Sequence, residues 1–443
     1  MLAVFRSQIG AKTSKIPQEI PSWYCQGILR SISAKIPVKT YRGAVFLGFY
    51  DSTFVPICLL FFGNFPYMIF FSLEILLIKG GEDLQAFHCK TKILSGPDAL
   101  SWLKGRKCKS LLMVTDPFFM ENGWAERIAG MVAAEKRAFF YKVKPDPTVE
   151  LAAEGTAFMR QANPDLLIAL GGGSAMDTAK AMGYFTGGQA LFVAIPTTSG
   201  SGSEVTDFSI LTHDGVKHPL IDSRMQPDVA ILASELVEKL PHSLVADGGF
   251  DVLSHALESF VATTATPMTR ALAGSAFRMT FERLSESFRG DKNAREEVHL
   301  ASCMAGLAFS QSGLGMCHAL SHALGGIFHL PHGRLNAILL PHVVEVNAVA
   351  ASKEYAKLAR MTGLGGSADT MAVRNLRNGL IRLRKELHLP ATLREAGISE
   401  QKVRQHREQI MEAALKDPCM DTNPVKGDAH LLGSVLDAVT GHG

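Results

Sequence analysis

Residues 165–180 read DLLIALGGGSAMDTAK, and this stretch decides the class of fold. The apolar run at 165–170 is too short for a helix and fits a buried strand. Gly171, Gly172, Gly173 and Ser174 follow at once, and a helix is expected from there through Gly183. A buried strand that enters a helix through a glycine turn is the repeating unit of a parallel α/β sheet.

The glycine turn also has a chemical use. Glycines let a backbone approach a phosphate closely, and the helix start offers free N–H groups and a positive dipole end. Ser174 is expected both to cap the helix and to donate to a phosphate. The turn lacks the GxGxxG dinucleotide fingerprint, so a tight turn without a ligand remains open as an alternative.

The flanking sequence continues the strand and helix alternation. Strands are expected at 110–115, 139–143 and 191–195, and helices at 122–134 and 148–161. After Pro241 no convincing strand remains, and helices are expected at 243–263, 266–288, 293–310, 316–327, 335–350, 353–361, 368–387 and 400–415. We therefore predict a parallel α/β domain at 84–240 and an all-helical domain at 241–443.

Two further features belong to the same edge of the predicted sheet. Residues 196–206, PTTSGSGSEVT, follow a strand and are rich in hydroxyls and glycine. Asp116 ends the strand at 110–115, where its carboxylate is placed to accept from a ribose 2′-hydroxyl and to repel a 2′-phosphate, which favours NAD over NADP. A solvated loop and a simple cap residue are the plainer interpretations of these two features.

A dense histidine cluster lies in the helical half. Residues 315–333 read GMCHALSHALGGIFHLPHG and contain four of the 15 histidines in the chain. Neutral imidazoles with one carboxylate suit a divalent transition metal, and residues four apart share a helix face. His332, between a proline and a glycine, is expected at a turn. The candidates are Asp251, His255, His318, His322 and His332, and spacing decides neither which four bind nor whether the metal is iron or zinc.

Composition limits the classes of function. The chain has 443 residues, 47% of them hydrophobic and 20% charged, with a net charge of +3, which fits a globular protein of two or three domains. This balance gives no reason to expect a nucleic-acid or acidic-lipid partner. Seven scattered cysteines without a CxxC pair indicate free thiols in a reducing, cytoplasmic setting.

Residues 1–83 do not match the rest of the chain. The segment at 44–78 is rich in Phe, Leu and Ile, but prolines, glycine and a glutamate make it a poor membrane span or signal peptide. Residues 79–82, KGGE, are what a purine-rich ribosome-binding sequence encodes in frame, and Leu84 follows at a suitable distance for a start codon. We expect 1–83 to be upstream sequence read through, or a disordered extension; a membrane-anchored form is the alternative.

Four motifs together resemble a known family. GGGSAMDTAK, PTTSGSGSEVT, DVLSHALES and GMCHALSHALGGIFHLPHG, in this order, look like the signatures of the iron-containing (group III) alcohol dehydrogenases. The resemblance runs from about Phe87 to the end of the chain, and it implies a Rossmann-like, dinucleotide-binding α/β domain at 84–240, a helical domain at 241–443 and a metal site in the cleft between them. The phrase ASCMAGLAFSQSGLGMCHALSHALGGIFHLPHG further resembles the propanol and ethanol dehydrogenases of propanediol- and ethanolamine-degrading pathways.

The resemblance implies roles for the site residues. Iron, or zinc, is expected on Asp251, His255, His318 and His332. The remaining cluster member, His322, is expected beside the nicotinamide as a proton relay, and Phe309 in the wall of the substrate pocket. Cofactor contacts are expected from Asp116, Gly172, Gly173, Ser174, Asp177, Thr197, Thr198, Ser201, Thr206 and Lys217. Ser201 replaces a more usual threonine, and Ala233-Ser234 replaces a frequent Asp-Pro beside the cofactor site.

The implied activity is hydride transfer between NAD(H) and a short primary alcohol or aldehyde, such as propanal, with Lewis-acid activation of the substrate oxygen. Alternatives within the superfamily are a glycerol, 1,3-propanediol or lactaldehyde type of polyol dehydrogenase and a dehydroquinate-synthase-like lyase. A metal- or nucleotide-binding protein without catalysis is a further class. A homodimer or larger homo-oligomer is expected, with association with a bacterial microcompartment pathway as a further expectation.

Overall fold

The computed structural model describes residues 86–213 and 216–441 and four short strands nearer the N-terminus, in two units, Met1–Leu84 and Gln85–Gly443. In the first unit, β1 (Val38–Tyr41) pairs with β2 (Ala44–Leu47), and β3 (Cys58–Phe62) with β4 (Phe65–Ile69), both antiparallel. The interpretations of residues 1–83 fall largely outside the described residues and stay predictions.

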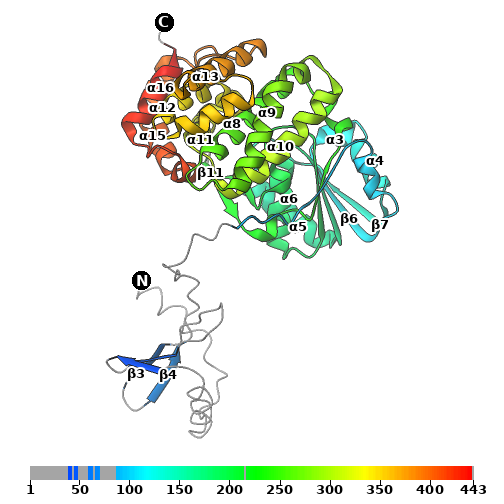
Figure 1. Cartoon of the computed structure of the whole chain (residues 1–443). Helices are drawn as coiled ribbons and strands as arrows, with labels where there is room; N and C mark the ends of the chain where they lie inside the picture. The colour runs from blue at the N-terminus through cyan, green and yellow to red at the C-terminus, as the bar shows by residue number, and fades with distance from the viewer. Residues whose placement is uncertain are drawn as a thin grey trace. The chain divides into compact units, whose positions relative to one another are not determined.

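A six-stranded sheet organises the first part of the larger unit (Figure 1). The strand order is β5-β12-β9-β8-β6-β7, and every neighbouring pair is parallel. The strands are β5 (Lys92–Ser95), β6 (Lys107–Thr115), β7 (Ala133–Phe140), β8 (Leu166–Gly171), β9 (Leu191–Pro196) and β12 (Val229–Leu232). The predicted parallel α/β class is therefore confirmed.

Both faces of this sheet are buried. Along β6, Leu111 and Met113 pack into one apolar cluster, while Leu112 and Val114 pack into another. Successive strand residues point to opposite faces, so the two clusters lie on opposite sides of the sheet. The covering helices are α3 (Pro117–Glu121), α4 (Trp124–Gly130), α5 (Val149–Ala162) and α6 (Gly173–Thr186), with the 3-10 helix η1 (Ala99–Leu103).

Some sequence expectations in this part were wrong. The helix expected at 122–134 ends at Gly130, because β7 begins at Ala133 and pairs with β6. Alanine, glutamate and lysine in AAEKRAFF favour a helix locally, but sheet pairing overrides that preference. The antiparallel hairpin of β10 (Phe208–His213) and β11 (Val216–Ile221) was not expected either.

The second part is helical within the described residues. Its helices are α7 (Ser234–Val237), α8 (His242–Val261), α9 (Pro267–Arg289), α10 (Lys292–Ser312), α11 (Met316–Phe328), α12 (His332–Met361), α13 (Asp369–Glu386), α14 (Glu400–Gln405), α15 (Arg407–Lys416) and α16 (Ala429–Thr440). Figure 1 shows α8 surrounded by other helices, and its residues from Phe250 to Val261 are all buried. The expected division at residue 240 into two domains stays a prediction.

Helix α12 joins two expected helices, at 335–350 and 353–361, and is non-helical only at Ala351. It is the one helix among the described residues that is long and apolar enough to cross a membrane, and most of it is buried in the fold. Its first residue is His332, so the turn expected at this histidine is a helix start. Pro331 ends the extended segment before it, which is the usual place for a proline.

Candidate active site and metal centre

Helix α8 presents three ionisable side chains on one buried face. Asp251, His255 and Glu258 follow one another at spacings of four and three residues, which places them in a row along the helix. All three are buried among apolar neighbours. Burying such groups costs free energy unless each is paired or bound, so this row requires partners.

Asp251 is the point on which the metal candidates converge. Its Oδ1 lies 3.5 Å from His332 Nε2 at the start of α12 and 3.8 Å from His318 Nε2 on α11. The ligand atoms of these three residues all lie within 4.8 Å of one another. His255 Nδ1 lies 3.9 Å from the same oxygen, and its ring stacks on His318 with centroids 4.5 Å apart.

These four side chains fit a divalent metal in their chemistry. His255 Nδ1 is buried without a hydrogen-bond partner, a costly state that a bound cation removes. Burial lowers the pKa of His255 to about 3 and holds the pKa of His332 well below its usual range, so both imidazoles are neutral. Burial opposes ionisation of Asp251, but the three imidazoles hold its pKa below its usual range. Neutral imidazoles and an ionised carboxylate are what metal binding requires.

The pKa of His318 is shifted in the opposite direction, upward. Burial lowers its pKa, but hydrogen bonds with Asp251 and Glu258 outweigh this and raise it to about 9, so His318 would have to release a proton when a metal binds. The Nδ1–H group of His318 donates a hydrogen bond to Glu258 Oε2, at 2.6 Å. A histidine that binds a metal through one nitrogen commonly donates the other N–H to a carboxylate, which fixes its tautomer and orientation. Glu258 therefore aims Nε2 of His318 at Asp251.

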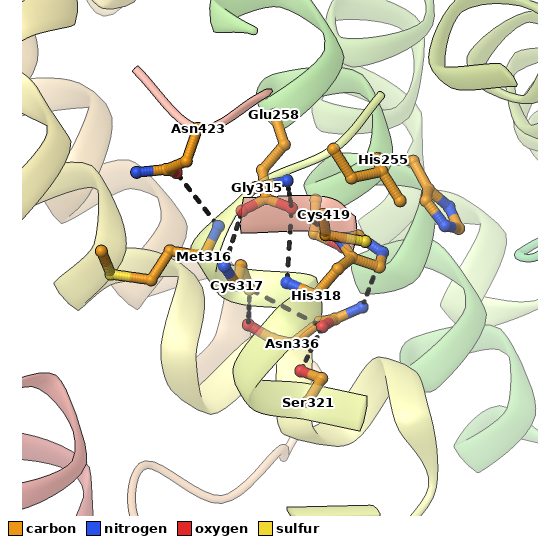
Figure 2. A network of polar contacts seen from close by, with 12 residues as sticks. His255, Glu258, Gly315, Met316, Cys317, His318, Ser321, Asn336, Cys419 and Asn423 are labelled. Atoms are coloured by element: carbon orange, nitrogen blue, oxygen red, sulfur yellow. Dashed lines mark hydrogen bonds and ion pairs between the residues drawn. The ribbon is translucent and has the colours of Figure 1, made fainter. Parts of the chain in front are cut away.

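Glu258 also fixes the start of α11 (Figure 2). Its carboxylate accepts from the backbone N–H groups of Gly315, at 3.1 Å, and Cys317, at 2.6 Å. The sequence analysis missed Glu258. The available signal was its position three residues after His255, on the same face of the helix.

Asn336 holds Asp251 from the other side. Its Nδ2 donates to Asp251 Oδ1 at 2.8 Å. Its Oδ1 accepts from Ser321 Oγ at 2.5 Å, as Figure 2 shows. Asn336 was also missed, although it lies four residues after His332 and thus on the same face of α12. The carboxylate oxygen nearest the histidines is therefore held in place by a fully paired amide.

His322 is placed apart from the converging ligand atoms. Its Nδ1 pairs with Asp417 Oδ2 at 2.8 Å, and its ring stacks on His332 with centroids 5.1 Å apart. Burial opposes ionisation of Asp417, but the contact with His322 lowers its pKa to about 2. An ionised Asp417 accepts the Nδ1 proton, so Nε2 of His322 is left free to exchange a proton. Asp417, 95 residues along the chain, was missed because no local pattern connects it to His322.

Phe309 supplies an apolar wall beside this centre. Its ring stacks on His255 with centroids 4.3 Å apart and an interplanar angle of 17°. The ring of Phe208 also contacts Phe309, with centroids 6.1 Å apart. The position expected to line the substrate pocket therefore contacts a metal candidate directly.

The two glycine-rich loops lie against each other at one edge of the sheet. Thr197 N donates to Gly171 O at 3.0 Å, which joins the ends of β8 and β9. A Cβ built on Gly172 would lie 3.2 Å from Thr198 Oγ1, and one on Gly173 would lie 3.3 Å from Ser201. A larger residue at either position would require the facing side chain to move by a few tenths of an ångström, so glycine favours this close approach.

The helix after the first loop has a free N-terminus. Helix α6 starts at Gly173 with Gly172 as its N-cap, and no side chain caps it, so Ser174 does not have the expected capping role. Uncapped backbone N–H groups at a helix start form a site for an anion such as a phosphate. Asp116, at the end of β6, accepts from Phe119 N at 3.2 Å and caps the short helix α3.

The second loop reaches the metal candidates. A Cβ on Gly200 would lie 3.3 Å from Asp251 Oδ2, and one on Gly248 of α8 would lie 2.5 Å from Ser199 O. The loop and α8 can approach this closely because each has a glycine at the contact, Gly200 and Gly248. The loop that meets the predicted phosphate turn therefore also meets the carboxylate at the centre of the histidine cluster.

Three further cofactor candidates lie elsewhere. Lys180 Nζ donates to Ser203 Oγ at 3.1 Å and to Thr206 Oγ1 at 2.8 Å, and Ser203 Oγ donates to Asp177 Oδ1 at 3.1 Å. Asp177 and Thr206 thus belong to a polar network around a buried lysine. Lys217 pairs with Asp146 at 2.7 Å. Their direct contact with a cofactor stays a prediction.

Comparisons with known proteins agree with this geometry. Residues 90–234 match the family model described as iron-containing alcohol dehydrogenase, and residues 245–439 match the C-terminal model of the same family. An NADPH-dependent butanol dehydrogenase from Clostridium saccharobutylicum is 39% identical, over 80% of this chain and 98% of that protein. A 1-propanol dehydrogenase from Citrobacter freundii is 38% identical, over 80% and 99%.

A solved structure shows the same fold. The iron-containing alcohol dehydrogenase from Thermococcus thioreducens superposes with a TM-score of 0.74 at 31% identity, covering 80% of this chain and 99% of that one. The two family models together span both the sheet with its glycine loops and the helices that carry Asp251 and the histidines. The chain therefore belongs to the iron-containing alcohol dehydrogenase family and is an oxidoreductase, an alcohol dehydrogenase.

Proposed function

We propose that this chain is a metal-dependent, NAD(H)-linked dehydrogenase that interconverts short-chain primary alcohols and aldehydes. The observation that carries the proposal is the contact between Gly200, in the hydroxyl-rich loop, and Asp251, on which three histidines converge. Hydride transfer needs the cofactor and the activated substrate side by side. The hydroxyl-rich loop meets that need, because it lies against both the glycine turn and Asp251.

Asp251, His255, His318 and His332 would hold the metal, and their side chains suit iron or zinc. A bound divalent cation at this place supplies Lewis-acid polarisation of the substrate oxygen. Glu258 and Asn336 orient His318 and Asp251 by hydrogen bonds of 2.6 and 2.8 Å, so these two side chains are positioned before a metal binds.

Gly172, Gly173 and the uncapped start of α6 would hold the cofactor pyrophosphate through backbone N–H groups. A bound nicotinamide cofactor supplies the hydride for aldehyde reduction and takes it up in alcohol oxidation. Asp116 favours NAD, because its carboxylate repels a 2′-phosphate. The Clostridium relative is named NADPH-dependent, and a comparison of rates with NADH and NADPH tests the preference of this chain.

His322 would move the proton that accompanies the hydride. In aldehyde reduction the oxygen gains a proton, and His322 Nε2 is the nitrogen free to deliver it while Nδ1 is held by Asp417. In alcohol oxidation the same nitrogen takes the hydroxyl proton. Asp417 acts by holding the imidazole in one tautomer and orientation and does not itself exchange the proton.

Phe309 and Phe208 favour a small apolar substrate over a polyol. An aromatic wall stacked on His255 offers no hydrogen-bonding group for extra hydroxyls. The names of the relatives, butanol and 1-propanol dehydrogenase, point to the same substrate size. We therefore favour propanal, butanal or a similar aldehyde over glycerol or 1,3-propanediol, with reduction as the direction in the cell. A homo-oligomeric state remains a prediction.

The decisive experiment joins metal analysis to a substrate screen. Purified protein should contain about one iron or zinc per chain and should reduce C2 to C4 aldehydes with NADH faster than it oxidises glycerol with NAD. Removal of the metal by a chelator should abolish reduction, and re-addition should restore it. Equal aldehyde reduction by fully metal-free protein would contradict the proposal.

A further inference from the structure

A second group of metal-ligating side chains lies next to the centre described above. His322 comes from α11, and Asp417 and Cys419 come from the 3-10 segment η4 (Pro418–Thr422) and its cap. The imidazole nitrogen, carboxylate oxygen and thiol sulfur all lie within 4.8 Å of one another. The closest pair is His322 Nδ1 and Asp417 Oδ2, at 2.8 Å.

We propose that His322, Asp417 and Cys419 form a second metal-binding site, which takes a thiophilic divalent cation such as Zn²⁺ and inhibits the enzyme when it is filled. Three ligands of these types leave one position for water, which is a common arrangement for zinc. The side chains of His322 and Asp417 are 23% and 14% exposed, so a cation can enter from solvent.

The arrangement of charges favours a cation here. Asp417 is ionised, and the Cys419 backbone N–H donates to its Oδ1 at 2.9 Å, which holds the thiol close to the carboxylate. Burial first, and then the Asp417 charge, raise the pKa of the Cys419 thiol well above its usual value, so without a metal the sulfur keeps its proton. A bound dication reverses this effect, because it stabilises the thiolate and neutralises the neighbouring carboxylate.

The ligand types separate this site from the resident one. The first site offers imidazoles and a carboxylate, which accept iron as well as zinc, whereas a thiolate selects softer ions such as zinc. Zinc is therefore expected to fill the second site while the resident metal stays in place.

Inhibition follows from the shared histidine, and this part rests on the proposed relay role of His322. A cation on Nδ1 replaces the hydrogen bond to Asp417 that fixes the imidazole. The metal, and no longer Asp417, then sets the orientation of the imidazole, so the relay loses the geometry that the carboxylate gives it. Metal binding itself does not depend on that role.

The test uses the protein loaded with its resident metal and titrates it with Zn²⁺. Total metal after gel filtration, the rate of aldehyde reduction, and alkylation of Cys419 followed by peptide mass spectrometry are measured together. We expect about one additional zinc per chain with the resident metal retained, protection of Cys419 from alkylation at the same zinc concentration, and a parallel loss of rate.

Two matched variants separate this site from general zinc effects. Cys419→Ser keeps the size and polarity of the side chain but removes the soft ligand, and activity without zinc should be unchanged. Loss of even an outer partner of a ligand lowers metal affinity roughly 10- to 100-fold, so zinc inhibition should weaken by at least about tenfold. Cys89→Ser removes an exposed thiol elsewhere and should leave zinc inhibition as in the parent protein.

Two results would overturn the proposal. One is equal zinc inhibition and zinc uptake in Cys419→Ser. The other is zinc uptake only in exchange for the resident metal, which would assign the inhibition to the first site. If the protein reduces no aldehyde under any condition, the proposed function fails, but zinc uptake and Cys419 protection still test this site.

Discussion

The two halves of the site are built in different ways. At the sheet edge, the loops after β8 and β9 are brought together by glycines, and backbone N–H groups face the space that a phosphate would take. In the helical part, Asp251, His318 and His332 come from three helices and are buried side chains held by Glu258 and Asn336. The sheet edge therefore depends on the absence of side chains at its glycines. The helical centre depends on the presence of side chains that would bind the metal or orient its ligands.

This contrast predicts two kinds of failure. Adding a methyl group to a loop glycine should weaken cofactor binding and leave the metal in place. Removing a side-chain atom from the helical centre should release the metal and leave cofactor binding nearly intact. Metal content and the KM for NADH therefore separate the two halves in every variant.

The largest effect is expected from His318→Ala. This change removes a ligand and also leaves the Glu258 carboxylate without its imidazole partner. We expect loss of the metal and a fall in aldehyde reduction of more than about 100-fold, beyond the roughly 10- to 100-fold typical of outer partners. Elemental analysis and NADH-linked rates measure both, while NADH binding measured by fluorescence should change little.

His329→Asn is the matched control for this variant. His329 is an exposed histidine on the same helix, at its left-handed C-cap with φ of 54°, a conformation that asparagine tolerates. Metal content and rate should equal those of the parent protein. Full metal content and activity in His318→Ala would show that the ligand assignment is wrong.

A smaller loss is expected from Glu258→Gln. Glutamine keeps the size of the side chain, but its NH₂ group replaces one of the two carboxylate oxygens, which together accept from the backbone N–H groups of Gly315 and Cys317 and from the His318 ring. Metal affinity and rate should fall about 10- to 100-fold. The metal-free protein should also lose about 1–3 kcal/mol of stability, because a buried N–H is left unpaired. If a chelator removed the metal from Glu258→Gln no more easily than from the parent protein, Glu258 would not have the role of orienting His318.

The fold and half of the site could be predicted because their signals are local. A glycine turn between an apolar run and a helix, and histidines four residues apart, are visible within about one helical turn or strand. The parallel sheet and the helices from α8 to α11 were predicted on this basis. Asp251, His318 and His332 are brought together as expected, although the structure does not test their role as ligands.

The missed features depend on contacts between distant segments. Asp417 meets His322 across 95 residues, and Glu258 meets α11 across about 60. The strand β7 has a helix-favouring sequence and becomes a strand only because β6 lies beside it. Helix starts add a further ambiguity, since the Pro-His-Gly at 331–333 fits a turn as well as a first helical residue.

On the loop side of the comparison, Gly172→Ala should raise the KM for NADH by about tenfold. The added Cβ would lie 3.2 Å from Thr198 Oγ1, so the Thr198 side chain has to shift against the glycine turn, and overpacking of this kind costs about 1–3 kcal/mol. Metal content should not change. Gly183→Ala is the control, because its Cβ would meet only Leu167 at 3.6 Å, an ordinary contact within the same part of the fold. Loss of metal in Gly172→Ala would break the distinction between the two halves.

The smallest effect is expected from Asp116→Gly, and it tests charge instead of space at the loop edge. Asp116 caps α3, and glycine at an N-cap costs only a few tenths of a kcal/mol, so thermal stability should hardly change. Without the carboxylate, the repulsion of a 2′-phosphate is lost. At a half-exposed position this repulsion is worth about 1 kcal/mol, so the ratio of kcat/KM for NADH over NADPH should fall about fivefold. The fall should come from a lower KM for NADPH, with kcat and metal content unchanged. An unchanged ratio would remove Asp116 from the cofactor site and leave it only as the cap of α3, so that charge at this edge would not select the cofactor.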